Sequence, residues 1–256
     1  MTETAVLVHT DPEMLAQAAA ARLIVRLVDA QADRGLASLV LTGGRIAAAV
    51  YRAIRDSPAR DAVDWSRVDV WWGDERFLPA GHPDRNETQA RADLLDAVAV
   101  NPARVHPMPP SDGPDGDDPE TAAARYAQAL ADAARPGTAR LPHFDVLLLG
   151  VGDDGHVASI FPEHPAVYDN RPVTAVRGSP KPPPVRLSLT LPAVNSAAEI
   201  WLIASGSAKS AAVAMALTGA GPMQLPAAAV HGVERTLWLL DRAAAAEVSL
   251  SARSLR

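Results

Sequence analysis

A histidine and two carboxylates follow a buried apolar run at residues 144–161, and these residue types can move protons. The run Phe144-Asp-Val-Leu-Leu-Leu ends in a glycine turn that carries Asp153, Asp154 and His156. A tight loop at the carboxyl end of a strand is where α/β proteins build their active sites. Histidine takes or gives a proton near neutral pH. The sequence therefore predicts a proton-transfer site at His156, with a structural histidine as the alternative.

The same turn also matches the dinucleotide-binding pattern, as Gly150-x-Gly152-x-x-Gly155. That pattern needs a pyrophosphate resting on backbone amides at the start of a helix. The two aspartates inside the turn would repel a phosphate, and two prolines follow too soon for a long helix. The acidic residue expected about 20 positions further on is also missing. Nicotinamide or flavin binding is therefore not expected.

Glycines and cations at other strand ends indicate an anion site. Gly43 and Gly44 lie between an apolar run and a helical pattern, where unpaired amides would point outward beside Arg45. An ordinary strand–helix turn is an equally good explanation of this piece alone. Lys209 stands in the first turn of a later helix, where a cation opposes the helix dipole. Arg186 enters a strand behind a proline-rich segment.

Asp74, Glu75 and Arg76 directly follow another apolar strand pattern, where turn chemistry alone would suffice. The functional interpretation is carboxylates for proton transfer or substrate hydroxyls, with Arg76 as an anion ligand. A surface charge cluster is the alternative. Cations gathered at one sheet edge of an acidic protein favour a small anionic ligand, most naturally a phosphate ester. No phosphoryl-transfer loop and no metal-ligand spacing is found, so we expect chemistry that spares the phosphate and uses no metal.

Composition excludes several classes of protein. The chain has 256 residues, a formal charge of −6 and a hydrophobic fraction of 48%, and it contains no cysteine. Disulfides, thiolate catalysis and cysteine-ligated metals are thereby excluded. The acidic charge without a basic run argues against nucleic-acid binding. No membrane span and no secretory signal is visible, so we expect a cytoplasmic protein.

The alternation of elements predicts an α/β fold: a mostly parallel, doubly wound, Rossmann-like sheet covered by helices on both faces. We expect one domain over residues 1–256, with a surface loop at 107–119. Strands are predicted at residues 4–9, 38–41, 68–72, 144–149, 173–176, 185–191, 199–204 and 236–240. Helices are predicted from Pro12 to about Gly35, at 46–55, 87–97 and 120–134, and from about Ser207.

Taken together, these motifs resemble those of the glucosamine-6-phosphate isomerase/6-phosphogluconolactonase family, and within it the 6-phosphogluconolactonases. They occur in the family's order from the second strand to beyond residue 209. A departure is Arg85 before Asn86, where the family often has serine. The matching pieces are residues 41–45, Trp72-Gly-Asp-Glu-Arg76, 150–162, 179–191 with its Lys-Pro-Pro-Pro-x-Arg, and Gly206-Ser-Ala-Lys209.

The resemblance implies hydrolysis of 6-phospho-D-glucono-1,5-lactone to 6-phosphogluconate without a cofactor, in the oxidative pentose phosphate pathway. It implies that His156 is the general base that activates water, and that Asp74 and Glu75 orient His156 or the sugar hydroxyls. Asp154 is counted among the substrate-binding residues. The phosphate-binding residues implied are Gly43, Gly44, Arg45, Arg76, Arg186 and Lys209.

Two alternatives remain within this fold. A deaminase has an Asn-Glu-Pro segment after the histidine loop, whereas here Val-Ala-Ser-Ile-Phe-Pro precedes Glu163. A non-catalytic sugar-phosphate sensor usually carries an added DNA-binding helical domain, which is not expected before Thr4. The expected partner is a small sugar phosphate, with no nucleic acid and no membrane. The oligomeric state is left open, with a monomer favoured.

Overall fold

The computed structural model describes residues 3–134 and 140–248 of the chain. Its main element is a six-stranded parallel sheet with the strand order β1-β9-β8-β5-β2-β3, and a smaller antiparallel sheet has the order β4-β7-β6. The strands are β1 (Glu3–His9), β2 (Ala37–Leu41), β3 (Val68–Trp72), β4 (Asp74–Arg76), β5 (Val146–Gly150), β6 (Val173–Val176), β7 (Arg186–Leu189), β8 (Glu199–Ala204) and β9 (Arg235–Asp241).

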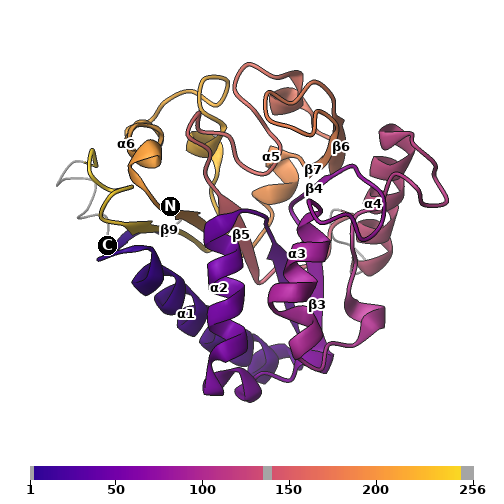
Figure 1. Ribbon diagram of the computed structural model, residues 1–256, viewed down its shortest axis with the longest axis horizontal. Helices are drawn as coiled ribbons and strands as arrows, with labels where there is room; N and C mark the ends of the chain where they lie inside the picture. The colour runs from indigo at the N-terminus through magenta and orange to yellow at the C-terminus, as the bar shows by residue number, and fades with distance from the viewer. Residues whose placement is uncertain (1–2, 135–139, 249–256) are drawn as a thin grey trace.

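Helices cover the large sheet because its central strands are apolar on both faces. All five residues of β2 and four of the five in β5 are buried, as parallel strands between two helical layers require. In Figure 1, α1 and α2 run beside each other below the label of β5. The helices are α1 (Pro12–Arg34), α2 (Arg45–Asp56), α3 (Asn86–Asp93), α4 (Pro119–Ala133), α5 (Leu191–Val194) and α6 (Ser210–Leu217).

The strand order contains a switch point between β2 and β5. From β2 the chain moves outward to β3, whereas from β5 it moves in the opposite direction through β8 to β9. Right-handed crossovers in the same direction put α1 and α2 on one face of the large sheet, where they pack against each other, while α4 packs against β6 and β7 of the small sheet. The loops after β2 and β5 diverge at this point and leave a crevice, where open α/β sheets bind their ligands.

Local sequence signals account for the longest helix, α1. The Asp11 side chain accepts a hydrogen bond from the backbone N–H of Met14, and Pro12 occupies the first turn. Gly35 ends the helix at φ 77°, in the left-handed region that glycine adopts without strain. The prediction from Pro12 to about Gly35 is confirmed.

The small sheet differs from the expected arrangement. Residues 173–176 and 185–191 were predicted as strands in a mostly parallel fold, and β6 and β7 form there, but they pair antiparallel with each other, and β7 pairs antiparallel with β4. The segment 177–185 between them holds no helix, so it cannot provide the crossover that parallel strands need. A short helix, α5, also begins at Leu191, inside the range predicted as strand.

Two predicted helices are shorter than expected. The range 87–97 contains α3 up to Asp93, followed by a separate 3-10 turn at Leu95–Ala97. The helix expected from about Ser207 begins as a 3-10 turn over Ser207–Lys209 and becomes α-helical at Ser210. In the described part of the chain, no helix has the length and apolar character to cross a bilayer.

Candidate active site

The carboxyl ends of β2, β5 and β8 open into a cleft of about 570 Å³, a volume typical of small-molecule sites. The cleft lies at the switch point of the sheet, and residues of β4 and β7 line it as well. Eight of the ten predicted site residues contribute to its lining, namely Gly43, Gly44, Arg45, Asp74, Arg76, His156, Arg186 and Lys209.

His156 is held by the carboxylate two residues before it. The Oδ1 atom of Asp154 lies 2.5 Å from the ring Nδ1 of His156 and accepts a hydrogen bond of 3.1 Å from its backbone N–H. Phe161 packs against the ring with a centroid separation of 4.6 Å. Because Nδ1 is engaged with Asp154, Nε2 is the ring nitrogen left for proton transfer.

Gly152 and Gly155 make this compact turn possible. A Cβ at Gly152 would lie 2.0 Å from His156 Nδ1 and 2.4 Å from Asp154 Oδ1, so a larger residue there displaces the pair. Gly155 has φ +82°, and a Cβ there would lie 2.2 Å from a methyl group of Leu225. The glycines that match the dinucleotide-binding pattern therefore allow the turn that places His156 beside Asp154.

Asp154 has a different place from the one expected. It was grouped with the substrate-binding residues, but its carboxylate faces His156 and it is not among the residues that line the cleft. Partial burial raises the pKa of Asp154, but the hydrogen bonds and the charge of His156 outweigh burial and hold it well below its usual range. Asp154 is therefore ionised at neutral pH and suited to orient the ring.

Asp74 lies in the cleft and is fixed from two sides. Its Oδ2 accepts a hydrogen bond of 2.8 Å from the hydroxyl of Ser159, which belongs to the histidine loop. Its Oδ1 and its backbone carbonyl accept hydrogen bonds of 3.3 and 2.9 Å from the Nδ2 of Asn86. Asp74 is only 5% exposed, so this carboxylate has one defined orientation.

Glu75 is a correction to the expected site. Consecutive residues of a strand point to opposite faces, so Asp74 and Arg76 face the cleft, whereas Glu75 points away and is fully buried. Its carboxylate accepts hydrogen bonds from the backbone N–H groups of Arg76, Asn86 and Glu87. It therefore holds the start of α3 and cannot orient His156 or a sugar hydroxyl.

Burial raises the pKa of Glu75 to about 7, although the charge of Arg85 and the three backbone N–H donors favour the ionised form. The Nη2 atom of Arg85 lies 3.7 Å from the Glu75 carboxylate, and both side chains are fully buried. Arg85 also donates hydrogen bonds to the carbonyl oxygens of Leu78 and Met108. Arg85, which stands where a serine was expected from the resemblance, therefore has a structural role behind the cleft.

One group of cations lies around the starts of α2 and of the turn that leads into α6. Gly44 precedes α2 at φ 106°, and no side chain caps the first amides of this helix. Burial lowers the pKa of Lys209, and the positive charges of Lys181 and Arg45 lower it further, while Asp153 opposes them. Free amides and crowded cations make this end of the cleft suited to a phosphate.

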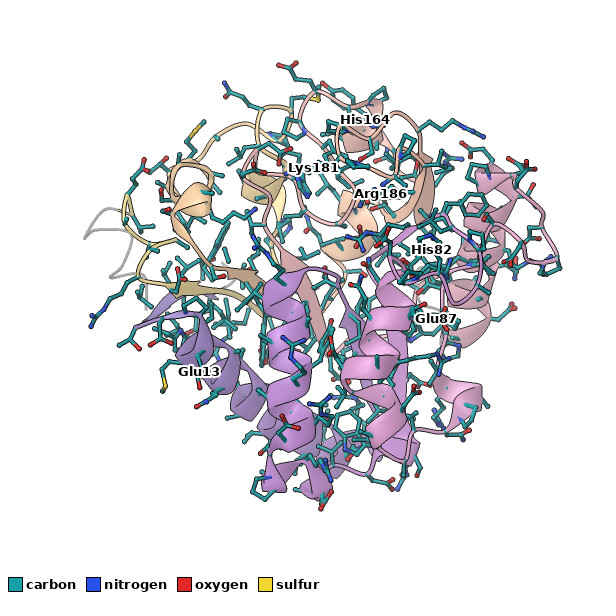
Figure 2. All side chains as sticks on the ribbon, in the orientation of Figure 1. Glu13, His82, Glu87, His164, Lys181 and Arg186 are labelled. Carbon is teal, nitrogen blue, oxygen red and sulfur yellow. The ribbon has the colours of Figure 1, made fainter. Side chains whose placement is uncertain are left out.

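Arg76 and Arg186 form a second cationic group near Asp74. The Nη1 atom of Arg76 donates a hydrogen bond of 2.7 Å to the carbonyl of Asp84. Arg186 is 7% exposed and donates hydrogen bonds to carbonyl oxygens of the proline-rich loop, including that of Lys181 at 3.0 Å. Figure 2 shows Lys181 and Arg186 in the upper part of the view, where Figure 1 labels β4 and β7.

Sequence reasoning did not assign Lys181 and Asn86 to the site, although both line the cleft. Lys181 pairs with Asp153 of the histidine loop. Lys181 and Lys209 are the only two lysines of the chain, which was a usable signal. The place of Asn86 in the cleft depends on contacts with Glu75 and Asp74, which lie 11 and 12 positions away, and no local pattern shows them. Among the described residues, no group of three or more acidic or histidine side chains is arranged to hold a metal ion.

Comparison with known proteins identifies the family. The model of the family described as glucosamine-6-phosphate isomerases/6-phosphogluconolactonase matches residues 10–238. The 6-phosphogluconolactonase of Streptomyces coelicolor is 62% identical over 246 residues, which are 95% of this chain and 94% of that protein. The 6-phosphogluconolactonase of Mycobacterium tuberculosis is 47% identical over 242 residues, 94% of this chain and 97% of that protein.

Solved structures agree with this assignment. The 6-phosphogluconolactonase of Trypanosoma brucei superimposes with a TM-score of 0.81 at 27% identity, over 97% of this chain and 100% of that chain. A monomeric glucosamine-6-phosphate deaminase superimposes with a TM-score of 0.78 at 21% identity, over 95% of this chain and 99% of that one, and this shows the fold alone. The chain belongs to the glucosamine-6-phosphate isomerase/6-phosphogluconolactonase family.

Proposed function

We propose that this protein hydrolyses 6-phospho-D-glucono-1,5-lactone to 6-phosphogluconate, the second step of the oxidative pentose phosphate pathway. The observation that carries the proposal is a histidine oriented by a carboxylate, His156 with Asp154, in a cleft also lined by Arg45, Lys209 and a free helix start. Such a site combines a base for activating water with a binding place for a phosphate. The named relatives support the choice of substrate.

In the first step, Nε2 of His156 takes a proton from a water molecule, and the water oxygen forms a bond to the lactone carbonyl carbon. The carbonyl oxygen becomes an oxyanion, which nearby cations and N–H groups stabilise. When the tetrahedral intermediate collapses, the bond between this carbon and the ring oxygen breaks. His156 then returns the proton to the ring oxygen, which becomes the hydroxyl of 6-phosphogluconate.

Asp154 supports this exchange by stabilising the imidazolium that forms after the proton is taken. Its own pKa lies well below the usual range, so it stays ionised while the ring gains and loses its proton. The 2.5 Å contact with Nδ1 also keeps Nε2 directed away from Asp154. Asp154 thus acts as the orienting carboxylate, the role that the resemblance assigned to Asp74 and Glu75.

The phosphate is proposed to bind at the cationic group of Arg45, Lys181 and Lys209, against the amides that follow Gly43. This group lies where two helical segments begin, after β2 and after β8. Arg76 and Arg186 lie near Asp74, whose charge acts on Arg186. Arg76 and Arg186 were also expected from the sequence to bind the phosphate. Their place beside Asp74 instead suits them to contact the sugar part of the substrate.

Deaminase chemistry has less support from the geometry. The acid that follows the histidine loop, Glu163, is not among the residues that line the cleft, and Asp74 is the one carboxylate among the described residues that do. The backbone N–H of Glu163 donates to the carbonyl of Met223, which holds that segment elsewhere. A ring-opening acid of the kind expected in a deaminase therefore has no counterpart there.

The test compares three substrates with the purified protein. 6-Phosphogluconolactone is generated in situ, and 6-phosphogluconate release is measured above the spontaneous rate. The proposal predicts clear acceleration for this lactone, much weaker acceleration for the phosphate-free lactone, and no ammonia release from glucosamine 6-phosphate. No acceleration with the phosphorylated lactone would refute it, and ammonia release would establish the deaminase instead.

We further propose that the protein acts as a single-domain monomer in the cytoplasm. In support of the single domain, one contiguous hydrophobic cluster extends through both sheets. The lack of cysteine in the sequence fits the cytoplasm. Light scattering on the purified protein tests this, since a mass of twice 26.9 kDa would contradict the monomer.

A further inference from the structure

Asn86 stands at the start of α3 and is almost completely buried, at 2% exposure, although it lines the cleft. Its backbone N–H donates a hydrogen bond of 2.6 Å to the Glu75 carboxylate, which anchors the residue from behind. Its Nδ2 donates to the backbone carbonyl of Asp74 at 2.9 Å and to the Asp74 carboxylate at 3.3 Å. Asn86 is therefore a fixed part of the cleft wall.

The orientation of the Asn86 carboxamide follows from its partners. Both groups of Asp74 that it meets are hydrogen-bond acceptors, so the amide nitrogen must face them. The Oδ1 atom then faces the opposite way and has no hydrogen-bond partner. A buried polar atom without a partner has an energetic cost, so its position calls for an explanation.

The Oδ1 atom of Asn86 faces the loop after β2. A Cβ built on Gly43 would lie only 2.0 Å from Asn86 Oδ1 and 2.6 Å from its Cγ. The carboxamide thus occupies the space where any other residue at position 43 would place its side chain. Gly43 belongs to the loop whose free amides begin α2, and Asp74 is the carboxylate of the cleft. One side chain therefore touches both.

We propose that Asn86 is a positioning residue that sets the separation between the anion-binding loop at Gly43 and the Asp74 carboxylate. Its amide nitrogen orients Asp74, and its oxygen packs against Gly43. The distance between these two parts of the cleft is thereby fixed. The kinetic consequences rest on the proposed lactonase activity. The packing between residues 43 and 86 does not, and it has a separate test.

The experiment is a double-mutant cycle with the variants Gly43→Ala, Asn86→Ala and the combination of both. Misplacing a binding group by about 1 Å can cost about 100-fold in rate, so each single variant is expected to lose at least about tenfold in kcat/KM. Asn86→Ala should also weaken competitive inhibition by inorganic phosphate at least about threefold. Because removal of the carboxamide makes room for the alanine at 43, the double variant should lose no more than the worse single variant.

Two control variants make the same kinds of substitution, Asn→Ala and Gly→Ala, at residues outside the cleft. Asn195→Ala removes hydrogen bonds to Ala229 and His231 outside the cleft, and Gly221→Ala adds a methyl group where nothing lies within 4 Å. Both should keep kcat/KM within about twofold of wild type. Losses that multiply in the double variant, or an Asn86→Ala variant with wild-type kcat/KM and phosphate inhibition, would overturn the proposal.

Measuring Tm for the same variants tests the contact between residues 43 and 86 separately from the proposed lactonase activity. Gly43→Ala should lower Tm, and the same change in the Asn86→Ala background should lower it by less than half as much. This result would support the contact even if wild type failed to hydrolyse the lactone, in which case only the proposed function falls. Equal Tm losses in both backgrounds would refute the contact, including when the single variants are too unstable to assay.

Discussion

The pair of His156 and Asp154 leads to a prediction about catalysis that can be worked from its geometry. In an Asp154→Asn variant, the side chain keeps its size but loses its charge. The 2.5 Å contact between Oδ1 and His156 Nδ1 then becomes a neutral hydrogen bond, and the imidazolium formed during the reaction has no adjacent anion. We therefore expect a loss in kcat, with the fold retained.

The size of this loss follows from the kind of bond and its exposure. A hydrogen bond to a charged group contributes about 1.5–3 kcal/mol, compared with about 1 kcal/mol for a neutral bond. The side chains of His156 and Asp154 are 18% and 33% exposed, so solvent screens part of the difference. The difference between the two kinds of bond is about 0.5–2 kcal/mol at most, which corresponds to about a 2- to 30-fold lower kcat.

The assay is 6-phosphogluconate release from lactone generated in situ, at saturating and limiting substrate concentrations. Asp153→Asn is the matched control, because it neutralises the neighbouring carboxylate, which pairs with Lys181 and not with His156. We expect a kcat within about threefold of wild type for this control. Equal kcat values for wild type and Asp154→Asn would refute the reasoning that Asp154 stabilises the charged ring.

Three other variants test separate parts of the site. Lys209→Ala should raise KM at least about tenfold with kcat within a few fold, because a phosphate contact is present throughout the reaction; a selective loss of kcat would contradict this. Gly152→Ala would place a Cβ 2.0 Å from His156 Nδ1 and should lower kcat more than about tenfold, and full activity would show that the turn adapts freely. Glu75→Gln tests pH dependence. A folded-state pKa of about 7, above the unfolded value of 4.5, gives stability that is present below pH 4.5 and lost as pH rises through 7. We compare the unfolding free energies of wild type and Glu75→Gln. The value for wild type minus that for the variant should fall by about 2 to 3 kcal/mol between pH 5 and 8. A difference that stays constant with pH would show that burial does not raise the pKa of Glu75.

Much of the fold was predictable because its signals are local. The cap at Asp11, the proline after it and the glycine at position 35 define α1, and continuous apolar runs mark the buried strands β2 and β5. The small antiparallel sheet was missed because strand patterns do not state their partners. The lack of a helix between β6 and β7 was the one available clue.

The site was predictable as far as strand ends determine it. Parallel strands bring their carboxyl ends to one edge, so residues far apart in sequence, such as Arg45 and Lys209, could be expected to meet. The alternation of side chains along β4 could have excluded Glu75 beside Asp74. By contrast, the contact of Asn86 with Gly43 and the pairing of Lys181 with Asp153 depend on loop geometry that only the folded chain defines.

The most direct test of the proposed mechanism is 6-phosphogluconolactone hydrolysis by wild type and by His156→Ala, measured above the spontaneous rate. If His156 activates the water, wild type should accelerate hydrolysis, and the variant should lose most of this acceleration, on the order of 100-fold or more. Its Tm and its inhibition by phosphate should stay close to wild type. A folded His156→Ala variant with full activity would contradict the central claim.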